Sequence, residues 1–302
     1  RVHYSDDIFA AGRISTALWD NPMKLKDLGV DLYNANFYQS KKFGASFLYD
    51  VSNSLTAKIG LNHENQNALF DYQYQNLGNS FKNVSTTVSL KFSPNDKNMM
   101  TPGGKLTYEK KFPQFFLNYE FGSKIFDGEL NYHRLDALAI HQFRSKLGTT
   151  TLKFLGGISS GTAPIWKNFE ITGQTNGSSE KWTSKINTPS TLGFVTMPSG
   201  TFYADKFVSL QVSQYLPFRF KTIGKTYSTL ELEYKSAVGN FKNPENHQFN
   251  FQVLNHNYQE VGFIWNRFLG RKFDVGFSYR LGYYQTSQFK DNFGLQIRLS
   301  GF

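Results

Sequence analysis

Side chains along most of this chain alternate between apolar and polar with a period of two residues. In the segment 82–93, valine, leucine and phenylalanine occupy most of the even positions, and asparagine, serine, threonine and lysine fill the odd ones. The segment 272–284 repeats the pattern with mainly aromatic residues on its apolar side. Successive side chains of a β-strand point to opposite faces of a sheet. The alternation therefore predicts an all-β fold with one apolar and one polar face.

The pattern predicts fourteen to sixteen strands, with sixteen favoured because long segments, and also 104–111, leave room for further strands. Two strands that flank residues 52–53 are expected to form a hairpin. Short junctions are predicted at 39–41 and 269–271, and long loops at 94–104, 161–200 and 236–248. The predicted strands are 8–18, 27–38, 43–50, 55–62, 68–77, 82–93, 113–122, 126–143, 149–158, 203–216, 226–237, 249–267, 272–284 and 290–302.

Aromatic content indicates what covers the apolar face. Phe, Tyr and Trp make up 17% of the chain, yet no stretch approaches 18 consecutive apolar residues, which excludes a helical membrane protein. A soluble β-sandwich would not tolerate so many outward aromatic and leucine side chains. The sequence predicts a single domain over 1–302, a transmembrane antiparallel β-barrel in the bacterial outer membrane. Its expected partners are outer-membrane lipid and lipopolysaccharide, and other envelope proteins in a complex.

No motif for catalysis or metal binding is visible. The chain has no cysteine, and its six histidines form no HxxxH or HExxH pattern. The net charge of +10 is scattered over inward strand positions and turns, without the clustered basic surface of a nucleic-acid-binding module. We therefore expect no catalytic residue, no cofactor, no metal and no nucleic acid. The scattered charge is interpreted as a solvated lumen and loops, with an anion-attracting lumen as the alternative.

The segment 161–200 is the longest predicted loop. Its aromatic and apolar content argues against a freely disordered segment, so we expect it to pack, folding into or capping the lumen. The candidate residues of this loop are Trp166, Trp182, Thr196, Met197, Pro198, Ser199 and Gly200. The candidate charges lining the lumen are Lys58, Lys91, Glu231, Glu233, Lys235 and Arg280.

The two ends of the given sequence each lead to a prediction, one about what precedes Arg1 and one about the role of Phe302. The chain begins at Arg1 without a charged-then-apolar leader, so we expect any signal peptide to lie upstream or to have been removed, and an upstream periplasmic domain is an open alternative. Phe302 is a candidate C-terminal recognition residue, because a terminal aromatic usually ends the last strand of an outer-membrane barrel. It lies one position out of phase with the apolar face of that strand, which requires a bulge.

Six segments from Lys91 onward carry a family resemblance. They are KFSP at 91–94, FPQFFLNYEFG at 112–122, LNYHRLDALAIHQF at 130–143, GTAPIW at 161–166, GFVTMPSGTFYADKFVSLQVSQYLPF at 193–218 and VGFIWNRF at 261–268. The chain resembles a Bacteroidota outer-membrane family of unknown function in which a barrel follows a carboxypeptidase-regulatory-like domain. That family is distantly similar to the assembly-factor and surface-antigen barrels, which have sixteen strands and an inward loop with an Arg-Gly-aromatic tip. Here residues 196–200 stand at the tip without an arginine, so that contact is not carried over.

The resemblance implies an assembly or translocation factor, working through a weak seam between the first and last strands, at 8–18 and 291–302. An exposed strand edge can recruit another chain, which gives this hypothesis a physical basis. Two further hypotheses stay open: a subunit that anchors a protein complex in the outer membrane, and a porin-like solute channel with a charged lumen. An enzyme is not expected, because no nucleophile, base and orienting acid converge in the pattern.

Overall fold

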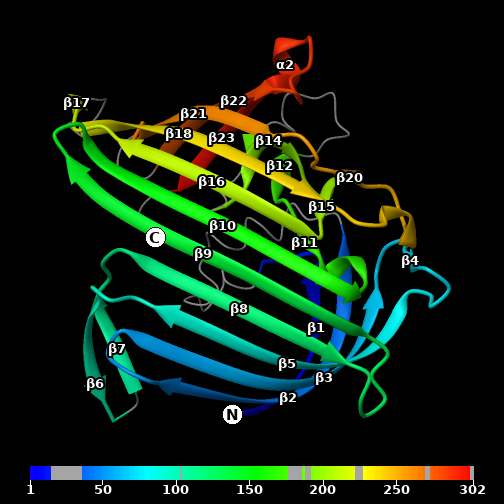
Figure 1. The fold of residues 1–302 in the computed structure, drawn as a ribbon. Helices are drawn as coiled ribbons and strands as arrows, with labels where there is room; N and C mark the ends of the chain where they lie inside the picture. The colour runs from blue at the N-terminus through cyan, green and yellow to red at the C-terminus, as the bar shows by residue number, and fades with distance from the viewer. Residues whose placement is uncertain are drawn as a thin grey trace.

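The structure is a computed structural model, and it describes residues 1–14, 36–102, 104–175, 186–187, 192–221, 227–268 and 273–299. The fold is all-β and is dominated by one large antiparallel sheet (Figure 1). Among the described residues, no helix has the length and apolar character needed to cross a membrane.

The large sheet contains 14 strands within the described residues, and most of them follow one another in space as they do in sequence. Within the same residues, no pairing joins its first strand, β1, to its last long strand, β23. The long strands are β1 (Val2–Ala10), β2 (Phe37–Asp50), β3 (Leu55–Ala68), β5 (Ser80–Phe92), β8 (Gln114–Ser123), β9 (Asn131–Ser145), β10 (Gly148–Thr162), β16 (Lys206–Tyr215), β18 (Tyr227–Asn240), β21 (Tyr258–Asn266), β22 (Phe273–Gly282) and β23 (Phe293–Leu299). Two short strands complete it, β13 (Ile186–Asn187) parallel to β23 and β17 (Phe220–Lys221) antiparallel to β18.

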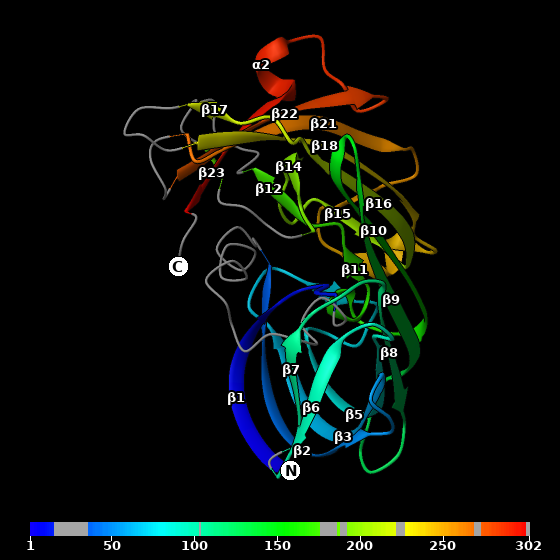
Figure 2. The same ribbon diagram turned by 90° about the vertical axis from the view of Figure 1, so that its left-hand side faces the viewer.

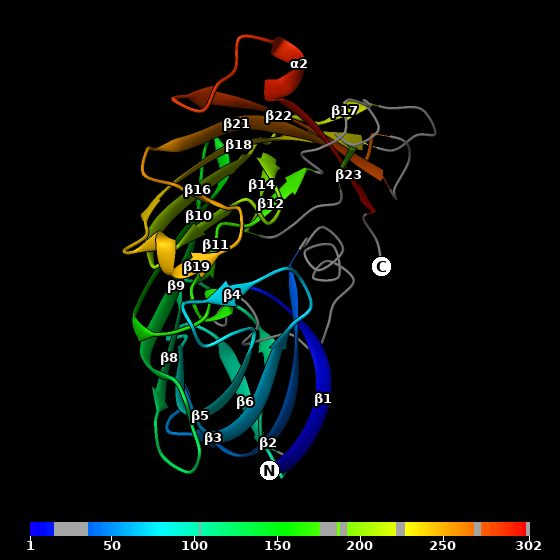
Figure 3. The same ribbon diagram turned by 90° about the vertical axis from the view of Figure 1, so that its right-hand side faces the viewer.

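Short elements lie along and inside the curve of this sheet, which Figures 2 and 3 show from its two sides. The pairs are β6 (Lys97–Thr101) with β7 (Gly104–Glu109), β4 (Gln73–Tyr74) with β19 (His247–Gln248), and β12 (Gly173–Thr175) with β14 (Phe194–Pro198). A group of three joins β11 (Phe169–Glu170), β15 (Phe202–Ala204) and β20 (Gln252–Val253). The described helices are η2 (Ile165–Lys167), η4 (Pro244–Asn246) and α2 (Phe289–Asn292).

The two faces of the large sheet have the opposite polarity to those of a water-soluble protein. On β3, Ile59 and Leu61 are 50% and 60% exposed on the outer face, whereas Glu64 and Gln66 are 5% and 0% exposed on the inner face. The outer face of the sheet exposes further large apolar side chains: Val2, Tyr4, Ile8, Phe43, Phe47, Tyr49, Phe92, Phe115, Phe154, Ile158, Val208, Leu210, Leu232, Val238, Phe263 and Phe273. Polar residues are therefore buried inside and apolar residues are exposed outside.

Two apolar clusters fill part of the inner side. One gathers around Trp166, Tyr72 and Tyr203, and the other around Phe169, Met197 and Tyr258. Both combine side chains of the short interior elements with inward side chains of the sheet. The hydrophobic core thus lies between the sheet and the segments that it curves around.

The alternation located most long strands correctly and misplaced several boundaries. The predicted junction at 39–41 is wrong, because β2 runs through it and Gln39 pairs with Ile8 of β1. The predicted strand 68–77 is wrong for most of its length, because Tyr72 and Tyr74 leave the sheet to join the aromatic cluster. The hairpin around residues 52–53 and the additional strand in 104–111 are confirmed.

Other predicted elements are shorter or more broken than expected. The segment 126–143 begins with a turn, so β9 starts only at Asn131, and in 249–267 the long strand β21 starts only at Tyr258. Only residues 8–10 of the predicted strand 8–18 belong to β1, which ends at Ala10, two residues before Gly12 with φ of 74°. Residues 15–18 lie outside the described residues, as do residues 27–35 and the predicted junction 269–271. The sixteen-strand count stays a prediction.

Candidate functional site

The residues that follow β10 turn inward and place Trp166 in the interior. A proline at position 164 precedes η2, where a missing N–H is tolerated because helix N-termini leave donors without intrahelical partners. The indole of Trp166 is 1% exposed and stacks on Tyr38 at 5.2 Å between ring centroids. Its Nε1 donates a 2.7 Å hydrogen bond to Oε1 of Gln66 on β3. This contact ties residues 165–171, the interior segment, to the large sheet, which forms the wall around it.

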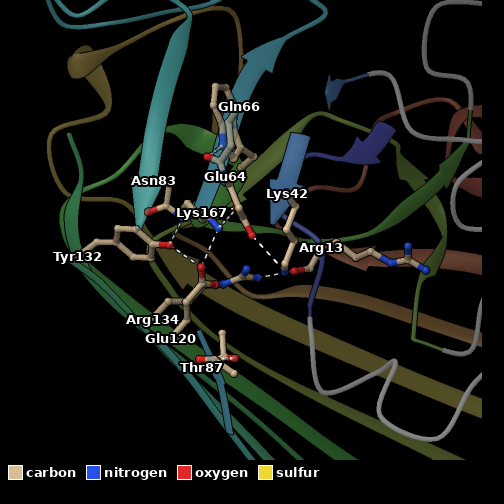
Figure 4. Close-up of polar contacts among 12 residues, drawn as sticks. Arg13, Lys42, Glu64, Gln66, Asn83, Thr87, Glu120, Tyr132, Arg134 and Lys167 are labelled. Carbon is tan, nitrogen blue, oxygen red and sulfur yellow. Dashed lines mark hydrogen bonds and ion pairs between the residues drawn. The ribbon is translucent and has the colours of Figure 1, made fainter. Parts of the chain in front are cut away.

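Lys167 lies next to this anchor and carries a buried charge to the inner face of the sheet. Its Nζ is 2.7 Å from Oε1 of Glu120 on β8 and 3.6 Å from Oε2 of Glu64 on β3 (Figure 4). All three side chains are less than a tenth exposed. Burial opposes the charge on Lys167, yet the carboxylates of Glu120 and Glu64 raise its pKa well above the usual value.

Neighbouring side chains of the wall complete the polar network in Figure 4. Lys42 on β2 reaches Oε1 of Glu64 at 3.1 Å, and Gln66 donates a hydrogen bond to Oε2 of the same carboxylate. Tyr132 on β9 donates to Glu120 and accepts a 3.1 Å hydrogen bond from Asn83 on β5. Two buried carboxylates are thus shared between the wall and one interior lysine.

Arg134 on β9 extends the network toward the N-terminal strand. It is the cross-strand partner of Glu120, and its guanidinium lies 4.8 Å from the ring centroid of Phe169 in the interior segment. Its Nη2 donates to the backbone oxygen of Arg13. The cation therefore contacts the wall, the interior segment and the chain that leaves β1.

A second set of contacts fixes residues 192–200 to the opposite part of the sheet. Glu260 on β21 accepts hydrogen bonds from the backbone N–H groups of Val195 at 3.0 Å and Thr196 at 2.8 Å, and from the Thr196 hydroxyl at 2.9 Å. Arg280 donates to the backbone oxygen of Thr196 at 2.9 Å, and Lys235 donates to that of Gly193 at 3.0 Å. A carboxylate and two cations of the wall hold this stretch by its backbone.

The two interior stretches meet at Glu170. Its Oε1 accepts a 2.8 Å hydrogen bond from the backbone N–H of Gly200, and the residue is 3% exposed. Burial raises the pKa of this carboxyl to about 8, although the hydrogen bond from Gly200 opposes the shift. Glu170 is therefore mostly protonated at neutral pH.

A cavity of about 450 Å³ remains between the interior segment and strands β1, β2, β3, β5, β8 and β9. Its lining combines cations, carboxylates, amides and hydroxyls with a few aromatic rings. Among the described residues, no group of three His, Asp or Glu side chains is arranged to hold a metal ion. Because its lining is mostly polar and charged, the cavity suits a polar organic ligand or water.

The structure places the predicted loop residues as follows. Trp166, Thr196, Met197 and Gly200 are buried on the inner side, Pro198 and Ser199 are half-buried, and Trp182 lies outside the described residues, as does Phe302.

The predicted lumen charges fall on the inner face in separate groups. Lys235 is 3.6 Å from Glu233, and Glu231 is half-buried two positions away. Lys91 lies 5.9 Å from the ring centroid of Phe116, Arg280 contacts Thr196, and Lys58 lines the cavity.

Sequence reasoning missed the residues that bind the interior segment most directly: Lys167, Glu64, Glu120, Arg134, Glu170 and Glu260. The alternation carried a signal for Glu64 and Glu120, since each occupies an inward position of a strand. Nothing in the sequence pattern paired them with Lys167, because the three residues lie far apart along the chain.

Comparison with known proteins gives one family match. Residues 27–158 match a family described as "Family of unknown function (DUF5686) C-terminal domain". The match contains three of the segments that carry the resemblance, at 91–94, 112–122 and 130–143, and it ends before the interior segment. No curated protein matches the chain. The similarity is thus to a family without an assigned function.

Proposed function

We propose that this chain forms a transmembrane β-barrel wall in the bacterial outer membrane, with its own interior segments closing the passage. In this proposal it belongs to the assembly or translocation type of barrel, or is a subunit of an outer-membrane complex. The observation that carries the proposal is the reversed polarity of the sheet together with an inner face that the chain itself occupies.

The outer face supports a lipid environment. Its aromatic side chains form neighbouring pairs across strands, such as Phe263 with Phe277 at 5.0 Å and Phe92 with Phe115 at 6.1 Å between ring centroids. Water would oppose so large an exposed apolar surface, whereas lipid chains would cover it. Inner residues such as Glu64 and Asn118 are satisfied by polar partners, as a wall facing a polar interior requires.

The occupied interior favours a plugged passage over an open pore. Residues 165–171 contribute buried side chains to both apolar clusters and residues 192–200 to the one around Met197, and the two stretches bind the wall through Glu120 and Glu260. In the described part of the chain, β23 pairs beyond β22 only with the two-residue β13. A strand edge with so few hydrogen bonds can accept another strand, which supports the assembly type.

A solute channel is the second candidate. The cavity of about 450 Å³ favours it, because this space is lined by charged and polar side chains. A channel needs a passage that conducts while the interior segments are in place.

Single-channel recording in a planar bilayer tests the proposal. We expect the intact chain to be closed and a variant lacking residues 163–200 to give large conductance steps. The double variant Lys167→Met/Glu260→Gln keeps the segment and removes its main polar contacts, and we expect it to open intermittently. Steady ion-selective conductance of the intact chain would favour the channel instead, and a deletion variant that inserts but stays closed would refute the interior plug.

A further inference from the structure

The cavity beside Lys167 has more positive than negative charge. Its lining includes the cations Lys42, Lys58, Arg134 and Lys167, but only two carboxylates, Glu64 and Glu120. His3 and Arg13 also line it. A site with uncompensated cations attracts anions, most strongly those with more than one negative charge.

Donors without partners point to a missing acceptor. Nε of Arg134 and Oγ of Ser40 have no hydrogen-bond partner among the described residues, although the two residues are only 4% and 2% exposed. Both line the cavity. A buried donor left unsatisfied is costly, and an anion that lies beside either group offers it oxygen acceptors.

Lys58 supplies an available charge at the other end of the cavity. Within the described chain it makes no hydrogen bond or ion pair, and the charged groups that act on it are the cations Lys42 and Arg1. The register of β2 and β3 places Leu48 beside Lys58 and Ser40 beside Gln66, so the cavity follows these strands. Eight residues of strand span about 27 Å.

Two glycines of the wall let polar side chains of the cavity lie close to the backbone. Gly60 lies on the inner face of β3, where an added Cβ would be 2.6 Å from Oγ1 of Thr87. Gly44 on β2 lies close to His3 and Asn62, and an added Cβ would be 2.7 Å from Oδ1 of Asn62. A larger side chain at either position would therefore displace side chains that line the cavity.

We propose that this cavity binds a small soluble phosphate ester. The phosphate group carries up to two negative charges and accepts hydrogen bonds from several directions, which suits a cavity lined by lysine, arginine and hydroxyl donors from separate strands. Amides and hydroxyls of Asn62, Asn118, Thr87 and Ser89 suit a polar body, and the volume is within the range of small-molecule sites. This site goes beyond the proposed function and does not depend on the membrane location.

Isothermal titration calorimetry on the purified chain in a neutral detergent tests the site with glucose 6-phosphate as ligand and glucose as its uncharged counterpart. We expect the phosphate ester to bind and glucose not to bind. Lys58→Gln should weaken binding about tenfold or more, because a hydrogen bond to a charged group is typically worth ~1.5–3 kcal/mol. Ser40 lies about 27 Å from Lys58 along the strands, beyond the reach of a hexose phosphate bound at Lys58, so Ser40→Ala should bind like the unmodified chain. Lys97→Gln, in the exposed β6–β7 hairpin, is the matched control and should bind like the unmodified chain.

Three results would overturn the proposal. The first is the absence of binding by glucose 6-phosphate, and the second is equal binding of this ligand to the Lys58→Gln variant. The third identifies a lipid as the source of the phosphate: if nanodiscs of phosphatidylglycerol abolish glucose 6-phosphate binding while those of phosphatidylcholine do not, a lipid headgroup occupies the site. Equal binding in both nanodiscs supports the soluble ligand.

Discussion

At the scale of single residues, Lys167 links the interior to the wall through charge. Its ammonium group is the buried cation closest to Glu120, and it also neutralises Glu64. Burying two carboxylates is unfavourable unless they are paired and hydrogen-bonded. The position of the interior segment and the stability of the wall are therefore coupled at this residue.

Replacing Lys167 with methionine keeps an unbranched side chain only one atom shorter and removes the charge. We expect the free energy of unfolding to fall by about 3–5 kcal/mol, the typical cost of breaking a buried ion pair by removing one partner. Chemical denaturation in detergent measures it. Adding Glu120→Gln to the variant should recover part of the loss, whereas Lys97→Met at the exposed pair with Glu109 should change little. A double variant no more stable than the single one would contradict the assigned pairing.

Glu170 predicts a pH dependence of stability. Its pKa is raised from 4.5 to about 8, so the unfolded chain loses this proton at lower pH than the folded chain does. The contribution of Glu170 is therefore fully present below pH 4.5 and is lost as the pH rises toward 8. Between these values the unfolding free energy of the Glu170→Gln variant should fall less than that of the unmodified chain. Identical pH profiles in denaturation experiments would show that the carboxyl is not held neutral.

The candidate site was only partly predictable from these residues. The two-residue period identified Lys58 and Lys235 as inward, because facing depends only on position within a strand. It gave no information on Lys167 or Glu170, which lie in short irregular elements where no period applies. Contacts between residues about a hundred positions apart, such as Trp166 with Gln66, require the three-dimensional fold.

At the scale of elements, the stretch 192–200 is held by its backbone. Glu260 accepts from two consecutive backbone N–H groups, a contact that depends on the shape of β14 more than on its side chains. Backbone groups and the Thr196 hydroxyl therefore bind the wall although residues 196–200 include no arginine. Glu260 on β21 holds this stretch together with Arg280 and Lys235.

Replacing Glu260 with glutamine should loosen this stretch. The amide removes the charge from a carboxylate that accepts three hydrogen bonds, and its NH₂ group cannot accept. We expect amide hydrogen exchange of Val195 and Thr196 to become about tenfold faster or more, in line with the loss of ~1.5–3 kcal/mol for hydrogen bonds to a charged group. Glu245→Gln, at an exposed position of η4, is the control. Unchanged protection in the Glu260 variant would show that the stretch is held by other contacts.

Strand prediction succeeded for most long strands and failed in two segments, 39–41 and 68–77. The polar residues at 39–41 resembled a turn, yet they pair with β1, and Lys41 lies 3.8 Å from Asp6. Residues 68–77 alternate like a strand, but Tyr72 and Tyr74 pack against His247 in the aromatic cluster. In both segments tertiary contacts outweighed the local pattern.

At the scale of the whole molecule, strand register extends the reversed polarity over the sheet. Pairing places residues of six neighbouring strands in one outward row: Phe47, Ile59, Val88, Tyr119, Leu135 and Ile158. The inner face opposite to this row carries the buried ionic network. The all-β class was predictable from the alternation, whereas the ionic network depends on register and curvature.

The environment of the outer face tests most directly whether the sheet faces lipid. The chain has no cysteine, so single cysteines can be introduced at Ile59 and Leu61 on the outer face and at Lys58 on the inner face, and each labelled with a nitroxide in lipid bilayers. We predict that the labels at Ile59 and Leu61 collide more with oxygen than with a water-soluble nickel chelate, and that the label at Lys58 shows the reverse. Outer-face labels as accessible to the nickel chelate as the label at Lys58 would contradict a lipid-facing wall.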